Sequence, residues 1–307
     1  VGLFASINCG QIVDLEVECS KFNINASNLN ADLYVGILAG VVRQTIDDTI
    51  DRNEKVKKTK IENISVKSLV DNVDNYCINL AQKSNFVGGA FGFIENGVNV
   101  TLGGGFTAVD LKHLMVVDNG AITDNDIYVG GFAGAIQSNV YINSANEITS
   151  ILSATVTGSL SGNATSGDNG KIIYQSYFGN GGLDVVLGEL IVEDAGYASS
   201  AVGGFIGGAI VEYSTATTAE GEGDSSIDFK AKNAEDFFNK IMIKDIGVSA
   251  NIVANGILNV GGIVGANDYY INNGYFTGKI KGKSNVGGIS GVSTNQISDS
   301  VVETGNE

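Results

Sequence analysis

The chain has 307 residues, of which 43% are hydrophobic and only 17% are charged, so it is not a charge-expanded disordered polymer. It contains 42 glycines and no proline, which excludes collagen and proline-rich linkers and leaves glycine a role at tight corners between strands. The formal net charge of −16 repels phosphate backbones and anionic lipids, so we expect neither nucleic-acid binding nor direct membrane insertion.

One hexad, Val-Gly-Gly followed by two mostly apolar residues and Gly, recurs along the chain. Degenerate copies begin at Val1 and Val35, and full copies begin at Val87, Val129, Val202, Val260 and Val286. Successive copies begin 34, 52, 42, 73, 58 and 26 residues apart. The last interval fits one three-sided coil of a repeat protein, and the longer intervals fit one to three coils with inserted loops.

The sequence therefore predicts an all-β fold, a right-handed parallel β-solenoid that forms one elongated domain over residues 1–307. At about 26 residues a coil, the chain would make roughly ten coils. The hexad glycines are expected at equivalent corners, where either a positive φ or a close backbone approach requires glycine. These glycines are Gly88, Gly89, Gly92, Gly130, Gly131, Gly134, Gly203, Gly204, Gly207, Gly261, Gly262, Gly265, Gly287, Gly288 and Gly291.

Short strands and polar stretches alternate between the hexads. Aliphatic strands are expected at 61–66, 111–116 and 241–248, upstream of several hexads. Polar excursions are expected at 47–60, 159–170 and 215–240. The last one contains an Asn233 cap followed by acidic and aromatic residues, which predicts one short helix over 233–240.

The hexads resemble the GLUG motif, named for Gly-Leu-hydrophobic-Gly. The matching segments are Gly89-Ala90-Phe91-Gly92, Gly131-Phe132-Ala133-Gly134, Gly204-Phe205-Ile206-Gly207, Gly262-Ile263-Val264-Gly265 and Gly288-Ile289-Ser290-Gly291. The sequence departs from the motif at Ala5, Ser6 and Ile37. GLUG repeats occur in bacterial and archaeal surface proteins, adhesins and some secreted peptidases, so the resemblance implies a stalk or binding region that is not catalytic.

Two acidic groups are candidate calcium ligands, because calcium takes carboxylate and carbonyl oxygens from loops. The first is the pair Asp124 and Asp126, and the second is the glycine-spaced cluster Glu220, Glu222 and Asp224. The alternative is Asx-type turns and a solvated run of charges. No other cofactor is expected.

No motif marks an enzyme. A glycosidase needs two carboxyl groups held about 5 to 10 Å apart, and no such pair is evident in the sequence. His113, the only histidine, alternates with Leu111 and Met115 on an expected strand, which favours a position at the edge of a rung. No GxSxG segment accompanies it. We therefore expect that the chain is not an enzyme.

Other side chains leave alternatives open. Tyrosines near turns form either a carbohydrate-binding stripe or rung positions over the core, and these are Tyr174, Tyr177, Tyr269, Tyr270 and Tyr275. The cysteines Cys9, Cys19 and Cys77 cannot all pair within the chain, although a Cys9–Cys19 bridge is an option. Glycosylation sequons begin at Asn25, Asn63, Asn99 and Asn163.

These features favour a structural or adhesive protein, either extracellular or on the cell surface. A host surface, carbohydrate and neighbouring surface proteins are the candidate partners, together with further copies joined end to end by β pairing. Alternatives are a polysaccharide-active lyase or glycosidase on the same solenoid, and the stalk of a larger secreted peptidase. Since the chain opens at Val1 without methionine, we expect a processed or truncated form. Neither end of the repeat looks finished, so we expect either a cut from a longer array or a subunit that polymerises head to tail.

Overall fold

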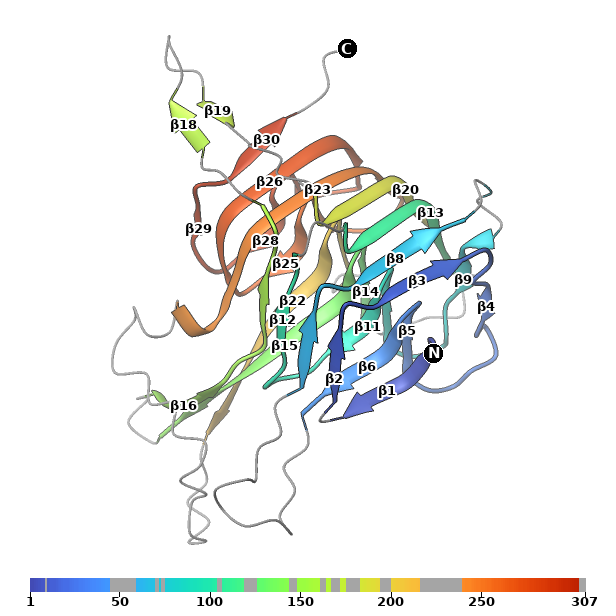
Figure 1. Ribbon diagram of the computed structural model, residues 1–307, viewed down its shortest axis with the longest axis horizontal. Helices are drawn as coiled ribbons and strands as arrows, with labels where there is room; N and C mark the ends of the chain where they lie inside the picture. The colour runs from blue at the N-terminus through green and yellow to red at the C-terminus, as the bar shows by residue number, and fades with distance from the viewer. Residues whose placement is uncertain are drawn as a thin grey trace, which may run out of the picture.

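The computed structural model is nearly all β, and almost all of its strand pairs are parallel (Figure 1). It describes residues 1–8, 10–44, 59–69, 72, 75–103, 107–118, 126–143, 148–160, 164–166, 172–174, 183–193, 200–215 and 239–303. Within these ranges, the antiparallel pairs are β15–β16 and β18–β19 alone. The prediction of an all-β protein with parallel strands is confirmed.

Two parallel sheets contain the hexads. The six-stranded sheet consists of β5 (Leu33–Gly36), β10 (Asn85–Gly88), β14 (Ile127–Gly130), β21 (Ala201–Gly203), β24 (Asn259–Gly261) and β27 (Val286–Gly287). The eight-stranded sheet consists of β1 (Phe4–Asn8), β6 (Ala39–Arg43), β11 (Phe91–Ile94), β15 (Ala133–Ile142), β22 (Ile206–Thr215), β25 (Val264–Asn267), β28 (Ser290–Ser293) and β16 (Ile148–Leu152). Each full hexad leaves the first sheet and enters the second.

A third sheet of fourteen strands carries the rest of each repeat. One row holds β2 (Gln11–Val13), β7 (Lys60–Glu62), β12 (Asn99–Thr101), β17 (Thr155–Thr157) and β29 (Ile297–Ser298). The next row holds β3 (Glu16–Cys19), β8 (Ser65–Ser68), β13 (Val109–Val117), β20 (Val185–Glu193) and β30 (Val301–Glu303), with β4 (Ile24–Asn25) and β9 (Cys77–Asn79) beside it. The long strands β23 (Met242–Ala254) and β26 (Tyr270–Lys281) belong to both rows. A separate hairpin joins β18 (Ala164–Ser166) to β19 (Ile172–Tyr174).

Within the residues that the structure describes, the chain crosses the eight-stranded sheet seven times in sequence order, and we number these passages as circuits one to seven. The strands of one circuit pair with those of the next, so the colours in Figure 1 pass from blue to red across the stack. β14 pairs directly with β21, although Val129 and Val202 are 73 residues apart in sequence. Every interval between hexads is therefore one circuit, and the expectation of roughly ten coils is wrong.

The hexads lie in register from the second circuit onward. Val35, Val87, Val129, Val202 and Val260 are aligned across the six-stranded sheet, and all of them are fully buried. The first copy is displaced by one residue. Phe4 pairs with Ala39, whereas the hexad alignment would place Ala5 there.

The core consists of ladders of apolar side chains that run through all seven circuits. One ladder comprises Ile12, Ile61, Val100, Val156, Ile243, Ile271 and Ile297. A second comprises Val17, Val66, Val109, Val185, Val248, Phe276 and Val302. The inner members of both ladders belong to one continuous hydrophobic cluster, so each circuit buries its apolar side chains against its neighbours.

The expected excursions fall largely outside the described residues. Residues 47–58, 161–163, 167–170 and 216–238 of these segments are not described. Of the expected helix at 233–240, Asn239 and Lys240 are described, and both are helical. No helix long and apolar enough to traverse a bilayer occurs in the described part of the chain.

Candidate functional site

The hexad glycines lie where the backbones of successive circuits approach closely. A Cβ atom on Gly89 would stand 2.2 Å from the carbonyl oxygen of Gly131, and one on Gly131 would stand 2.2 Å from that of Gly204. None of the hexad glycines has a positive φ. Among the described glycines, those with a positive φ are Gly97, Gly256 and Gly278. Of the two expected reasons for glycine at the corners, positive φ is wrong. Close backbone approach is the reason, because a Cβ atom would collide with a carbonyl oxygen of the neighbouring circuit.

The last glycine of each hexad brings the two sheets together on the outside of the corner. A Cβ atom on Gly92 would stand 2.5 Å from the backbone nitrogen of Val35, which belongs to the preceding circuit. This close packing lets side chains on either side of the hexad meet. The ring centroids of Phe86 and Phe93 are 5.0 Å apart.

These contacts build an aromatic corner on the outer face, which consists of Tyr34, Phe86, Phe93 and Tyr128. Tyr34 and Phe86 stack with centroids 5.1 Å apart and planes 5° apart. Phe86 and Tyr128 stack at 5.5 Å and 16°. With Val41, Ala135 and Ile210 they form a hydrophobic cluster separate from the main core. A ligand would meet ring edges and hydroxyls here, because the ring faces cover one another.

Sequence reasoning missed the aromatic corner, although a signal was present. An aromatic residue stands directly before the hexad valine in three successive copies, as Tyr34, Phe86 and Tyr128. In the later circuits the same column holds Ala201 and Asn259, then continues to Asn285. Asn285 Nδ2 donates to Asn259 Oδ1 at 2.8 Å, so the outer column changes from apolar to polar along the stack.

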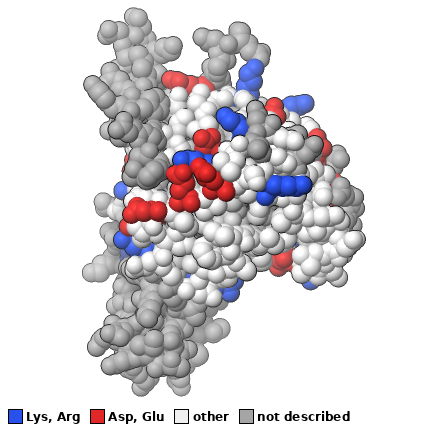
Figure 2. Space-filling view, turned by 45° about the vertical axis from the view of Figure 1, so that its right-hand side comes forward, with Lys and Arg blue, Asp and Glu red and all other residues white. Residues whose placement is uncertain are grey.

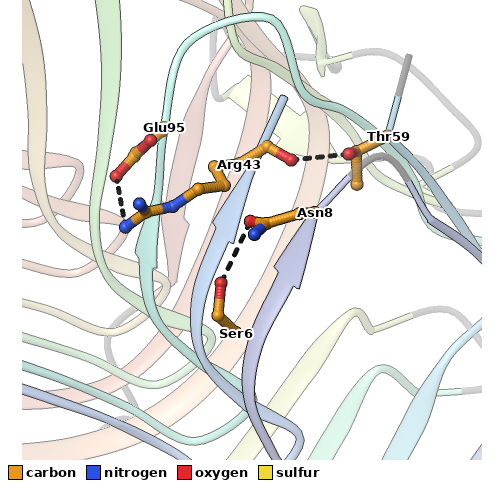
Figure 3. Close-up of polar contacts among 5 residues, drawn as sticks. All are labelled: Ser6, Asn8, Arg43, Thr59 and Glu95. Carbon is orange, nitrogen blue, oxygen red and sulfur yellow. Dashed lines mark hydrogen bonds and ion pairs between the residues drawn. The ribbon is translucent and has the colours of Figure 1, made fainter. Parts of the chain in front are cut away.

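Polar side chains contact one another near the ends of β1, β6 and β11 (Figure 3). Asn8 pairs in register with Arg43, and Arg43 Nη2 lies 3.0 Å from Glu95 Oε1. Ser6 Oγ donates to Asn8 Oδ1 at 3.1 Å, and Thr59 Oγ1 donates to the Arg43 carbonyl at 2.6 Å. Arg43 Nε is buried and has no hydrogen-bond partner, and these five residues offer no nucleophile paired with a base.

Burial dominates the electrostatics of the corner. It raises the pKa of Tyr128 to about 12, and the charges of Asp126 and Asp268 act in the same direction. Burial also raises the pKa of Tyr34 and of Glu95, and Arg43 opposes both shifts. The tyrosine hydroxyls therefore remain protonated at neutral pH and can donate as well as accept hydrogen bonds.

A second repeated feature is a left-handed Asx corner in the fourteen-stranded sheet. Asp14, Asn63, Asp245, Asn273 and Asp299 occupy equivalent positions between its two rows, with φ of 54°, 49°, 58°, 56° and 49°. Asn63 Nδ2 donates to Asp14 Oδ1 at 2.9 Å, and Asn273 Nδ2 donates to Asp245 Oδ1 at 2.8 Å. Asn and Asp tolerate this backbone region better than other residues that carry a Cβ.

In the fourth circuit a buried carboxylate lies where the Asx corner is interrupted. The chain leaves the sheet after Ser159 and returns at Asp184, which is fully buried. Asp184 Oδ1 accepts hydrogen bonds from Ser159 N and Ser159 Oγ, each 2.8 Å long, and Oδ2 accepts one of 2.9 Å from Gly247 N. Burial nevertheless raises the pKa of Asp184 to about 6.

Of the expected calcium ligands, the structure describes Asp126 alone. Asp126 directly precedes β14, and its carbonyl accepts a 2.8 Å hydrogen bond from Asn85 N. Asp124 and the cluster at 220–224 lie outside the described residues. Within the ranges that are described, no group of three or more His, Cys, Asp or Glu residues could hold a metal ion.

Three other residues that the sequence analysis discussed, Tyr269, Tyr275 and His113, contact neighbouring strands or loops. Tyr269 is fully buried, and its hydroxyl lies 2.5 Å from Ser138 Oγ, so it cannot belong to a carbohydrate stripe. Tyr275 is also buried, and burial raises its pKa to about 12. His113 on β13 pairs in register with Glu189 on β20, and its Nδ1 lies 3.3 Å from Glu189 Oε2.

The cysteines show no bridge among the described residues. Cys19 and Cys77 are not joined in a disulfide, and Cys19 Sγ donates to the Lys21 carbonyl at 3.3 Å. Cys9 lies outside the described residues, but Cys19 carries a free thiol, so the Cys9–Cys19 bridge is not formed in this structure.

Charged side chains on the outer surface are arranged in mixed groups. Figure 2 shows acidic side chains gathered beside basic ones on a face that is otherwise mostly uncharged. On the fourteen-stranded sheet, Lys67 Nζ lies 2.9 Å from Glu16 Oε2. This hydrogen bond raises the pKa of Lys67, and the nearby charges of Glu18 and Asp110 act in the same direction.

Comparisons with known proteins returned no match, whether with family models, with curated proteins or with solved structures.

Proposed function

We propose that this chain is a right-handed parallel β-solenoid that acts as a structural and adhesive component outside the cell or on its surface. The observation that supports this best is the register of the hexads, which aligns the same residues of successive circuits across the six-stranded sheet. Such a stack presents columns of repeated side chains on its outer faces, as solenoids that work as scaffolds do. The resemblance of the hexads to GLUG repeats favours the same role.

The outer columns fit a contact surface better than a reaction centre. The aromatic corner offers ring edges and protonated hydroxyls. Beside it, Arg43 pairs with Glu95 through Nη2, while its buried Nε has no hydrogen-bond partner. Contacts of this kind bind another surface through apolar area and hydrogen bonds. A host surface, carbohydrate or a neighbouring surface protein would each supply such contacts. Calcium bound by Asp124 and Asp126 remains part of the proposal.

Labelling of intact cells tests the location. Antibodies raised against the purified chain are expected to label unbroken cells of the producing organism or to detect the chain in their medium. Labelling that requires prior lysis would contradict the proposal.

An activity assay separates this role from its alternatives, the polysaccharide-active enzyme and the stalk of a secreted peptidase. The purified chain is incubated with a panel of acidic and neutral polysaccharides, and reducing ends and unsaturated products are measured. We expect no product above that of a heat-denatured control. Sustained turnover of any polysaccharide would favour the enzyme.

A further inference from the structure

We infer that Cys77, Met115 and His113 form a binding site for a soft monovalent metal ion, with copper(I) as the ion that fits best. A thiolate and a thioether select copper(I), and imidazole also suits copper. The chain has only one histidine, two methionines and three cysteines, so abundance does not explain why these three side chains lie together. The site goes beyond the proposed structural role and does not depend on it.

Cys77 and Met115 face each other across the neighbouring strands β9 and β13 (Figure 1). The next pair in the same register, Ile78 and Val116, is fully buried in the core. Since side chains alternate along a strand, Cys77 and Met115 lie on the outer face, where both are half-buried. Strands are about 4.8 Å apart, and two metal–sulfur bonds of about 2.3 Å span a similar distance, so one ion can bridge the two sulfur atoms.

His113 supplies the third ligand from the same strand as Met115. Both residues are half-buried, whereas Leu114 between them belongs to the core. The imidazole Nδ1 of His113 lies 3.3 Å from Glu189 Oε2 on β20. A histidine that donates its Nδ1–H to a carboxylate presents Nε2 to a metal, and most metal-ligating histidines have a partner of this kind. Glu189 is therefore the positioning residue of the site.

The surroundings of the three ligands favour copper(I) over harder ions. The column that contains Met115 continues to Ile191 and Val253, which are half-buried, so apolar side chains border the site. Such a border limits the access of water, and hard ions prefer oxygen ligands and water. In the described part of the chain, His, Cys, Asp and Glu side chains alone form no group of three that could hold an ion, so binding depends on the thioether.

Titration with copper(I) under nitrogen tests the site in the 307-residue chain, with Cys9→Ser/Cys19→Ser as the reference. A colorimetric copper(I) chelator competes for the ion, which gives the stoichiometry and the dissociation constant. Binding replaces the thiol proton of Cys77 by the ion, the proton passes to solvent, and no electron is transferred. We expect a single copper(I) ion per chain and ultraviolet absorption from the thiolate–copper bond. Adding Cys77→Ser to the reference should abolish both.

Variants of the other ligands test their separate contributions. Met115→Leu and His113→Gln should each weaken copper(I) binding by about tenfold or more, and so should Glu189→Gln. Glu189→Asp retains the carboxylate and should bind more tightly than Glu189→Gln. Met242→Leu is the matched control, because Met242 is the other methionine of the chain and lies on β23, opposite Tyr270. It should bind copper(I) like the reference, and every variant should keep the reference Tm without metal.

X-ray absorption of the copper-loaded reference identifies the bound atoms directly. We expect two sulfur atoms and one nitrogen bound to copper. A spectrum without sulfur ligands, a titration that Cys77→Ser leaves unchanged, or equal affinity of Met115→Leu and Met242→Leu would overturn the site. Tighter binding of zinc(II) than of copper(I) would overturn it too, since zinc sites use thiolate, imidazole and carboxylate ligands. Labelling of intact cells does not depend on these results and still judges the proposed function.

Discussion

The substitution Gly131→Ala adds a single methyl group at the centre of the stack, and we expect it to lower the free energy of unfolding. The new Cβ atom would stand 2.2 Å from the Gly204 carbonyl oxygen, 2.7 Å from Leu187 Cδ1 and 3.0 Å from Val185 Cγ1. The carbonyl would have to move by roughly 1 Å to reach ordinary contact, yet Gly204 lies between β21 and β22, which both pair with strands of the neighbouring circuits. Overpacking of this kind costs about 3 kcal/mol.

Thermal unfolding followed by circular dichroism measures this loss. A cost of about 3 kcal/mol lowers the Tm of a chain of this size by roughly 6 °C. Gly103→Ala is the matched control, because its Cβ atom would meet nothing nearer than Asn63 Oδ1 at 3.5 Å. Gly288→Ala is intermediate, since its Cβ atom would meet only the Val302 side chain, at 2.5 Å, in the last circuit. Equal Tm values for Gly131→Ala and Gly103→Ala would refute the close-approach reasoning.

Four further outcomes are expected. The folded-state pKa of Asp184 lies above its unfolded value, so its contribution to stability is greatest below pH 4 and is lost as the pH rises through about 6. Lowering the pH from 7.5 to 5 should therefore stabilise the wild type by about 1 kcal/mol more than Asp184→Asn in urea unfolding. Tyr269→Phe removes a buried hydroxyl partner of Ser138 and should cost about 1 kcal/mol in the same assay. Phe86→Ala should lower stability by about 3 kcal/mol without changing the far-ultraviolet spectrum. Calorimetry should detect calcium binding that Asp126→Asn abolishes, and an absence of binding heat would remove the calcium prediction.

The repeat itself could be found in the sequence, but the number of circuits could not. The 26-residue step between Val260 and Val286 is one circuit, and β24 pairs with β27 as that spacing requires. A 73-residue step is also one circuit, because the chain adds β16 and the β18–β19 hairpin before it returns. Spacing alone cannot separate an insertion from an additional coil, since both lengthen the interval by tens of residues.

The columns of side chains on the outer face were harder to predict from the sequence than the columns that point into the core. The valine column of the hexads keeps the same residue from the second circuit to the seventh. The aromatic corner changes to Ala201 and then to asparagine after three circuits, so it leaves no pattern that spans the chain. A positive φ was expected at the hexad glycines as one of two reasons for glycine there. Asp14 and Asn63 in the Asx corner adopt a positive φ instead, and their side chains hydrogen-bond to each other.

The position of Asp184 explains how one circuit can hold a long insertion without breaking the stack. In the next circuit, strand β23 passes through its Asx corner at Asp245 without an insertion. The Asp245 carbonyl accepts a 2.9 Å hydrogen bond from Leu160 N, just before the inserted chain. On the returning side, Asp184 N donates to the Gly247 carbonyl at 2.9 Å, and the carboxylate binds Ser159 and Gly247 N. The neighbouring circuit therefore serves as a template that fixes where the inserted chain departs and returns. Because each circuit is held chiefly by its neighbours, insertions can vary in length at the outer corners while the inner ladders keep their register.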